Sequence, residues 1–68
     1  MPKGVGEKIR EARTEAALSR DELARLAFLS SDSIASYELG RRRPRLDSLG
    51  AIARATGRAP GWFLEEAA

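Results

Sequence analysis

The sequence predicts an all-α fold, a compact five-helix domain, and three features support that prediction. Apolar residues recur at spacings of three and four along most of the chain, as they do on one face of an α-helix. Ser19 and Ser30 each precede such a stretch and are suited to cap the N-terminus of a helix. The alternation of apolar and polar residues that marks a β-strand is absent. We expect one domain over residues 1–68, with a short flexible N-terminus at residues 1–4.

The first predicted helix covers residues 5–16. Its apolar positions share one helical face and are Val5, Ile9, Ala12 and Ala16. Ala17 would end this helix in a left-handed conformation, which glycine adopts more easily.

Two further short helices are predicted between Leu18 and Gly40, over residues 20–27 and 31–38. At the start of the earlier helix, Ser19 and Glu22 have the spacing of a capping box. At the start of the later helix, Ser30 is the cap. Apolar pairs flank both starts as hydrophobic staples and are Leu18 with Leu23, and Leu29 with Ile34.

These two helices offer very different amounts of apolar surface. The earlier helix has a full apolar face, formed by Leu23, Ala24, Leu26 and Ala27. The later helix has only Ile34 and Tyr37, and its other side is small and polar. A helix with a strong start signal and a narrow apolar edge is typical of one presented to a partner. Helix-turn-helix is therefore the economical interpretation.

The rest of the chain predicts an extended loop and two more helices. Gly40 is expected to end the preceding helix, and Pro44 favours extended backbone over residues 41–45. A fourth helix follows over residues 46–56, with Gly57 as its stop. Pro60 suits the first position of a last helix. That helix holds Trp62, Phe63 and Leu64.

Positive charge is concentrated in one part of the chain, although the net charge is only +2. Residues 1–29 carry six basic and five acidic side chains, which nearly cancel. Residues 41–58 carry six arginines against Asp47 alone. Four of these arginines directly follow the predicted helix-turn-helix and are Arg41, Arg42, Arg43 and Arg45. They suggest contacts with phosphate; the alternative is an ordinary solvated loop.

Composition excludes several classes of protein. The chain has no cysteine and no histidine, which excludes disulfides and zinc sites of the Cys/His kind. No apolar run is long enough to span a membrane, and no signal-peptide pattern follows Met1. An enzyme is the least supported class, because the chain lacks a nucleophile elbow and a phosphate-binding glycine loop. We expect a cytoplasmic protein with no cofactor, metal ion, membrane or small-molecule partner.

Taken in order, the segments of the chain resemble the phage-repressor and Cro-like helix-turn-helix family, the XRE-type transcriptional regulators. The resemblance runs from about Val5 to Leu64. It rests on VGEKIREAR, LSRDELA, SDSIASYELGRRRP, LDSLGAIARATG and PGWFL. It implies a repressor-like DNA-binding domain with the helix-turn-helix at helices 2 and 3, and double-stranded DNA as the partner.

The resemblance also assigns roles to individual positions. Arg20 matches a residue that contacts phosphate, and Arg45 matches one that lies along the minor groove. Arg13 and Glu38 match an ion pair between helix 1 and the end of helix 3. The positions that contact base edges in the major groove are Ser31, Asp32, Ala35 and Ser36. Core positions are matched by Ala24, Leu26, Ile34 and Tyr37.

Three positions depart from the family pattern. Phe28 replaces the usual glycine of the turn, and we expect it to offset the backbone cost by covering apolar surface. Arg20 replaces the usual glutamine. Asp32 could accept a hydrogen bond from cytosine N4, or it could only stabilise the first turn of its helix. Because the base-contacting face has no Arg, Asn or Gln, phosphate contacts and DNA shape should contribute more than usual.

Two functional hypotheses remain open. The first is a sequence-specific transcriptional regulator that binds a two-fold-symmetric operator as a homodimer. Trp62, Phe63 and Leu64 are its candidate dimer residues, with one of the two aromatic side chains expected in the core. The second hypothesis is an antitoxin or adaptor module on the same fold, whose main partner is a protein. Salt-dependent duplex binding would favour the first hypothesis.

Overall fold

A computed structural model describes residues 4–65 of the chain and contains five α-helices in that range. The helices are α1 (Val5–Glu15), α2 (Arg20–Ala27), α3 (Ser31–Glu38), α4 (Leu46–Thr56) and α5 (Pro60–Leu64). No β-strand occurs within residues 4–65, so the all-α, five-helix prediction is confirmed. Helix α1 ends one residue earlier than predicted. The predicted flexible N-terminus lies outside the described residues, apart from Gly4.

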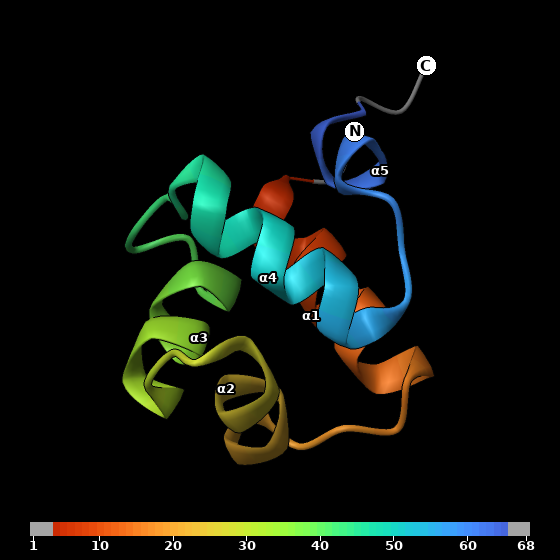
Figure 1. The fold of residues 1–68 in the computed structure, drawn as a ribbon. Helices are drawn as coiled ribbons and strands as arrows, with labels where there is room; N and C mark the ends of the chain where they lie inside the picture. The colour runs from red at the N-terminus through yellow and green to blue at the C-terminus, as the bar shows by residue number, and fades with distance from the viewer. Residues whose placement is uncertain (1–3, 66–68) are drawn as a thin grey trace.

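The helices enclose one core (Figure 1). Helix α4 crosses the middle of the molecule in front of α1, while α2 and α3 lie side by side at one edge. Helix α5 packs against α1 and α4 at the opposite end from α2. Each helix contributes one of the largest fully buried side chains, and these are Ile9, Leu23, Ile34, Ile52 and Phe63. Each such burial contributes about 1.5–3 kcal/mol, so every helix is held by the common core.

The predicted helix starts are present. Ser19 Oγ accepts a hydrogen bond from the Glu22 backbone N–H at 3.0 Å, and Glu22 Oε1 accepts one from the Ser19 N–H at 2.8 Å. These reciprocal bonds form the capping box of α2. Hydrogen bonding to Ser19 lowers the pKa of the Glu22 carboxyl group. The larger effect comes from the Ser19 backbone N–H and the smaller one from the Ser19 side chain. At α3, Ser30 Oγ accepts from the Ser33 N–H at 3.0 Å.

The first four helices are each followed by a residue in the left-handed backbone region. These residues are Ala17 (φ 58°), Phe28 (φ 58°), Gly40 (φ 75°) and Gly57 (φ 72°). The residue after each one donates its N–H back into the helix; for example, Leu29 donates to the Ala24 carbonyl at 2.8 Å. Glycine adopts this conformation freely, whereas a residue with a Cβ pays about 1–2 kcal/mol.

Two expectations about apolar side chains were wrong. Phe28 covers no apolar surface, because its side chain is 93% exposed at the left-handed end of α2. Leu26 is 54% exposed and is not a core residue. Helix α2 buries the arc formed by Leu23, Ala24 and Ala27, and Leu26 lies outside that arc. The other three expected core positions are buried as predicted and are Ala24, Ile34 and Tyr37.

No helix within the described residues is both long and apolar enough to cross a membrane.

The exposed, left-handed Phe28 generates a stability prediction. Phe28→Gly should raise the free energy of unfolding by about 1 kcal/mol, because it removes backbone strain and almost no buried surface. Gly57→Ala is the matched control. A Cβ there meets nothing within 4 Å, so only the backbone conformation (φ +72°) opposes it. That variant should lose about 1 kcal/mol. Urea denaturation measures both changes, and a less stable Phe28→Gly protein would contradict the assignment of strain.

Candidate nucleic-acid interface

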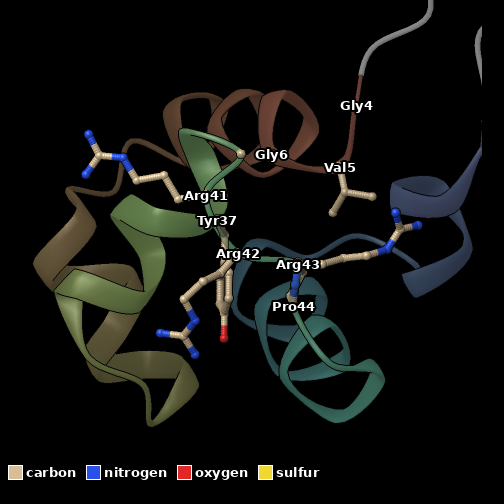
Figure 2. A pocket seen from close by; sticks show the side chains of 9 residues that line it. Gly4, Val5, Gly6, Tyr37, Arg41, Arg42, Arg43 and Pro44 are labelled. Atoms are coloured by element: carbon tan, nitrogen blue, oxygen red, sulfur yellow. The ribbon is translucent and has the colours of Figure 1, made fainter.

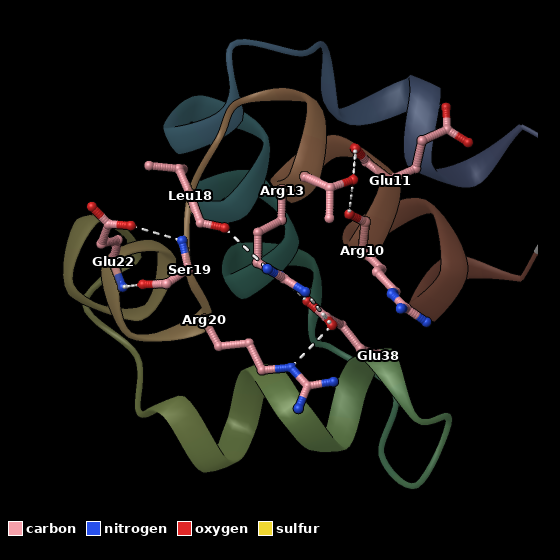
Figure 3. Close-up of polar contacts among 9 residues, drawn as sticks. Arg10, Glu11, Arg13, Leu18, Ser19, Arg20, Glu22 and Glu38 are labelled. Carbon is pink, nitrogen blue, oxygen red and sulfur yellow. Dashed lines mark hydrogen bonds and ion pairs between the residues drawn. The ribbon is translucent and has the colours of Figure 1, made fainter.

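A buried carboxylate ties three helices together (Figure 3). The Glu38 side chain, at the end of α3, is only 1% exposed. From α1, Arg13 donates to it through Nε at 2.6 Å and through Nη2 at 3.2 Å. From the start of α2, Arg20 donates through Nε at 3.1 Å. The expected partners Arg13 and Glu38 are therefore in direct contact, and Arg20 joins them, which the sequence interpretation did not include.

The two arginines differ in solvent exposure and in their further hydrogen bonds. The Arg13 side chain is 14% exposed, and its Nη1 also donates to the Leu18 carbonyl at 3.0 Å, which fixes the connection between α1 and α2. The Arg20 side chain is 40% exposed. Its Nε alone is used by Glu38, so a planar guanidinium is held at the start of α2 with its far edge toward solvent.

A close backbone approach also positions α3. A Cβ built on Gly6, in the first turn of α1, would lie 2.2 Å from the Tyr37 carbonyl oxygen and 3.0 Å from that of Glu38. Only glycine permits this contact, because both neighbouring atoms belong to the backbone. Sequence interpretation missed this role of Gly6, since its signal is tertiary and the residue sits in an otherwise ordinary first turn.

The outward side of α3 carries the four expected base-contacting residues. Asp32 is exposed, and Ala35 and Ser36 are partly exposed. Ser31, at the first position of α3, donates its hydroxyl to the carboxylate of Asp21 on α2. The hydroxyl proton of Ser31 is thus already engaged, and Asp21 adds a second carboxylate close to this face.

The arginine side chains of the loop after α3 diverge from one another (Figure 2). Figure 2 shows the side chains of Arg41, Arg42 and Arg43 pointing in three different directions around a groove of about 250 Å³. Arg42 lies against α3, with its guanidinium 5.4 Å from the centre of the Tyr37 ring and its Nη1 donating to Ser33 Oγ at 3.3 Å. Arg45 is exposed just before α4. The loop therefore presents a spread positive surface, of which Arg42 lies beside α3 (Figure 2).

A buried lysine that the sequence interpretation missed supports α5. Lys8 is 7% exposed, and its Nζ donates to the carbonyls of Trp62, at 2.9 Å, and Glu65. The Trp62 ring lies 5.3 Å from Lys8 Nζ and 4.0 Å from the guanidinium carbon of Arg58. The available signal was its spacing on the apolar face of α1, three residues after Val5 and four before Ala12.

This arrangement separates the three candidate dimer residues. Phe63 is 1% exposed and belongs to the core, so it is the aromatic side chain that completes the core. Trp62 is partly buried against that core, and Leu64 is 52% exposed. Of these three residues, Trp62 and Leu64 have surface left for contact with a second copy.

Comparison with known proteins identifies the family. A model of the helix-turn-helix family matches residues 9–63, which include the whole of α2 and α3. The chain belongs to the helix-turn-helix family. A second finding agrees with this membership: the restriction-modification controller protein C.AhdI from Aeromonas hydrophila is 30% identical over 87% of this chain and 89% of its own, with a TM-score of 0.84. No curated protein matches significantly in sequence.

More distant solved structures share the helix-turn-helix fold. The DNA-binding domain of the P22 c2 repressor superimposes with a TM-score of 0.88 at 24% identity, covering 91% of this chain and 82% of that one. SinR, described as the master regulator for biofilm formation and solved in complex with DNA, gives a TM-score of 0.86 at 22% identity. The match covers 90% of this chain and 98% of SinR.

Glu38 and Arg20 differ in burial, so their substitution should lower the free energy of unfolding by different amounts. Glu38→Ala should lower the free energy of unfolding by about 3 kcal/mol, because it leaves Arg13 largely buried without its counter-charge. Arg20→Ala should cost less than about 1 kcal/mol, since its side chain is 40% exposed and Arg13 still neutralises Glu38. Chemical denaturation of both variants checks this order. Similar losses in the two proteins would show that Arg20 is as important to folding as Glu38.

Proposed function

We propose that this chain is a sequence-specific transcriptional regulator that binds double-stranded DNA and places α3 in the major groove. The observation that carries the proposal is the position of α3. Its polar outer face is flanked by two cations: Arg20, whose side chain is 40% exposed, contacts Glu38 on one side of α3, and Arg42 contacts Ser33 and Tyr37 on the other. A duplex has phosphates on both sides of its major groove, so cations flanking a presented helix match that geometry.

Family membership and the solved relatives support this proposal. The P22 c2 repressor has been solved with a synthetic operator, and SinR has been solved with DNA. In this chain, Arg20, Arg41, Arg42, Arg43 and Arg45 would contact phosphates and so fix the position of the domain on the duplex. Ser31, Asp32, Ala35 and Ser36 would face base edges. The activity is binding without catalysis, and we place it in the cytoplasm.

A homodimer would give the protein a longer recognition sequence. Two copies related by a two-fold axis would contact two half-sites about one helical turn apart. Leu64 is 52% exposed at the end of α5, beside the partly buried Trp62, and these two side chains are our candidates for the dimer contact. Analytical ultracentrifugation of Leu64→Glu would test that assignment, since a charge at the contact should favour the monomer.

A second candidate function is a protein-binding module on the same fold. The favouring observation is the acidic character of the α3 face, where Asp32 is exposed and Asp21 accepts the hydroxyl of Ser31. One solved relative of this fold, SinR, has been determined in complex with SinI; that match covers 60% of the SinR chain. A protein partner would not produce the salt dependence expected for a duplex.

Salt titration of duplex binding tests the DNA proposal. Log affinity should fall linearly with log salt, with a slope of about −0.9 for each phosphate that is neutralised. Replacing Arg41, Arg42, Arg43 or Arg45 singly with Ala should weaken binding to all duplexes alike and reduce the slope by about one contact. Arg54→Ala is the matched control, because Arg54 is exposed on α4 about 13 Å along the helix from Arg45. Unchanged binding by a folded quadruple variant would exclude phosphate contacts by this loop.

Asp32 generates a separate prediction. We expect Asp32→Asn to raise affinity for all duplexes without changing the preferred bases, because it removes a repulsive charge near phosphate. Stability should fall by a few tenths of a kcal/mol, as an acid in the first turn is lost. Asp47→Asn, an exposed acid in the first turn of α4, provides the control for that stability change. If Asp32→Asn instead alters one preferred base toward adenine, Asp32 accepts a hydrogen bond from cytosine.

A further inference from the structure

Leu39 extends the outward face of α3 by one more position. Its backbone is still helical (φ −85°, ψ −2°), and its N–H donates to the Ala35 carbonyl at 3.0 Å. Asp32, Ala35, Ser36 and Leu39 follow the spacing i, i+3, i+4, i+7, so their side chains occupy one arc of the helix. The buried side chains of α3, Ile34 and Tyr37, lie outside that arc.

Leu39 is the large apolar side chain of this arc, and it is 57% exposed. Beside it, Ala35 is partly exposed and adds a methyl group. The rest of the arc offers one carboxylate and one hydroxyl, and no side chain capable of bidentate hydrogen bonds to a base. The strongest contact that this end of α3 can make with a base edge is therefore apolar.

Only one base presents an apolar group of this kind in the major groove, because thymine carries a C5-methyl group there. We propose that Leu39, assisted by Ala35, determines sequence specificity by packing against thymine methyl groups. This inference rests on the proposed function and names the base feature that the face selects. Asp32 and Leu39 are seven residues apart, about 10 Å along the helix, so the two ends of the face reach different base pairs.

Charge and size favour DNA as the occupant of this apolar patch. Two exposed arginines follow Leu39 closely in sequence: Arg41, and Arg42, which lies along α3 against Tyr37 and Ser33. The cation of Arg42 therefore lies on the same helix as the apolar surface, which suits a methyl group set among phosphates. A patch of one leucine and one alanine is also far smaller than the roughly 800 Å² per partner that a stable protein interface needs.

The experiment compares Leu39→Ala with Leu26→Ala in the full chain. Leu26 is 54% exposed on α2, so both variants lose the same atoms from similarly exposed positions, and both should fold. Wild type and both variants are used to select bound duplexes from a random pool. Each thymine of the selected wild-type site is then replaced singly by deoxyuridine, which removes the methyl group and keeps the base pairing.

We expect wild type and Leu26→Ala to select the same thymine in each half-site. Deoxyuridine at that position should weaken their binding about fourfold, the value of one buried methyl group. Leu39→Ala should select any base at that position and should bind the thymine and deoxyuridine duplexes equally. For this variant, the slope of log affinity against log salt should equal that of the wild type, because no phosphate contact is lost.

Three results would overturn the inference and leave DNA binding intact. The first is an equal deoxyuridine penalty in wild type and Leu39→Ala, and the second is selection by the wild type of a site with no required thymine. The third is a change in oligomeric state of Leu39→Ala with an unchanged base preference, which would assign Leu39 to a protein contact. Failure of the wild type to bind any duplex in a salt-dependent manner would refute the proposed function itself.

Discussion

The orientation of α3 depends on compensation of one buried charge. An ionised carboxylate that is 1% exposed is stable only with close counter-charges, and those of Glu38 come from two other helices, through Arg13 and Arg20. Moving any of the three helices separately would break a hydrogen bond to that carboxylate. The same charge therefore fixes the helix-turn-helix geometry and holds the guanidinium of Arg20 at the start of α2, beside the face that α3 presents.

The contact at Gly6 acts on the same end of α3. The first turn of α1 approaches the carbonyls of Tyr37 and Glu38 so closely that no side chain fits between them, while the ion pairs hold Glu38 through its side chain. Both anchors act behind the outer arc of α3, whose residues Asp32 and Leu39 remain exposed. Rigid support behind an exposed face is what a recognition helix requires, because an orientation already fixed before binding lowers the entropic cost of association.

Signals within a few neighbouring residues predicted the helices. The exposure and direction of several side chains could not be predicted, because they depend on how the helices pack. Serine caps and left-handed ends are properties of a few neighbouring residues, so the bounds of α2 and α3 could be predicted from the sequence. The exposure of Phe28 and Leu26 could not, because it depends on which arc of α2 meets α4. The divergent directions of the loop arginines and the burial of Lys8 likewise arise from packing. The Arg13–Glu38 contact followed from the family resemblance, whereas the participation of Arg20 appeared only in the structure.

The small side chains on the outer face of α3 would allow this rigidly held helix to approach DNA closely. Ser31, Ala35 and Ser36 extend little beyond the helix backbone, so α3 could lie deep in a major groove before its side chains met the bases. Close approach would bring Arg20 and Arg42 nearer to phosphates on either side, which strengthens the attraction of each charge. It would also let the longer Leu39 reach a base edge, with the methyl group of Ala35 beside it. On this view, the absence of Arg, Asn and Gln from the face allows phosphate contacts and one apolar contact to determine both position and preference.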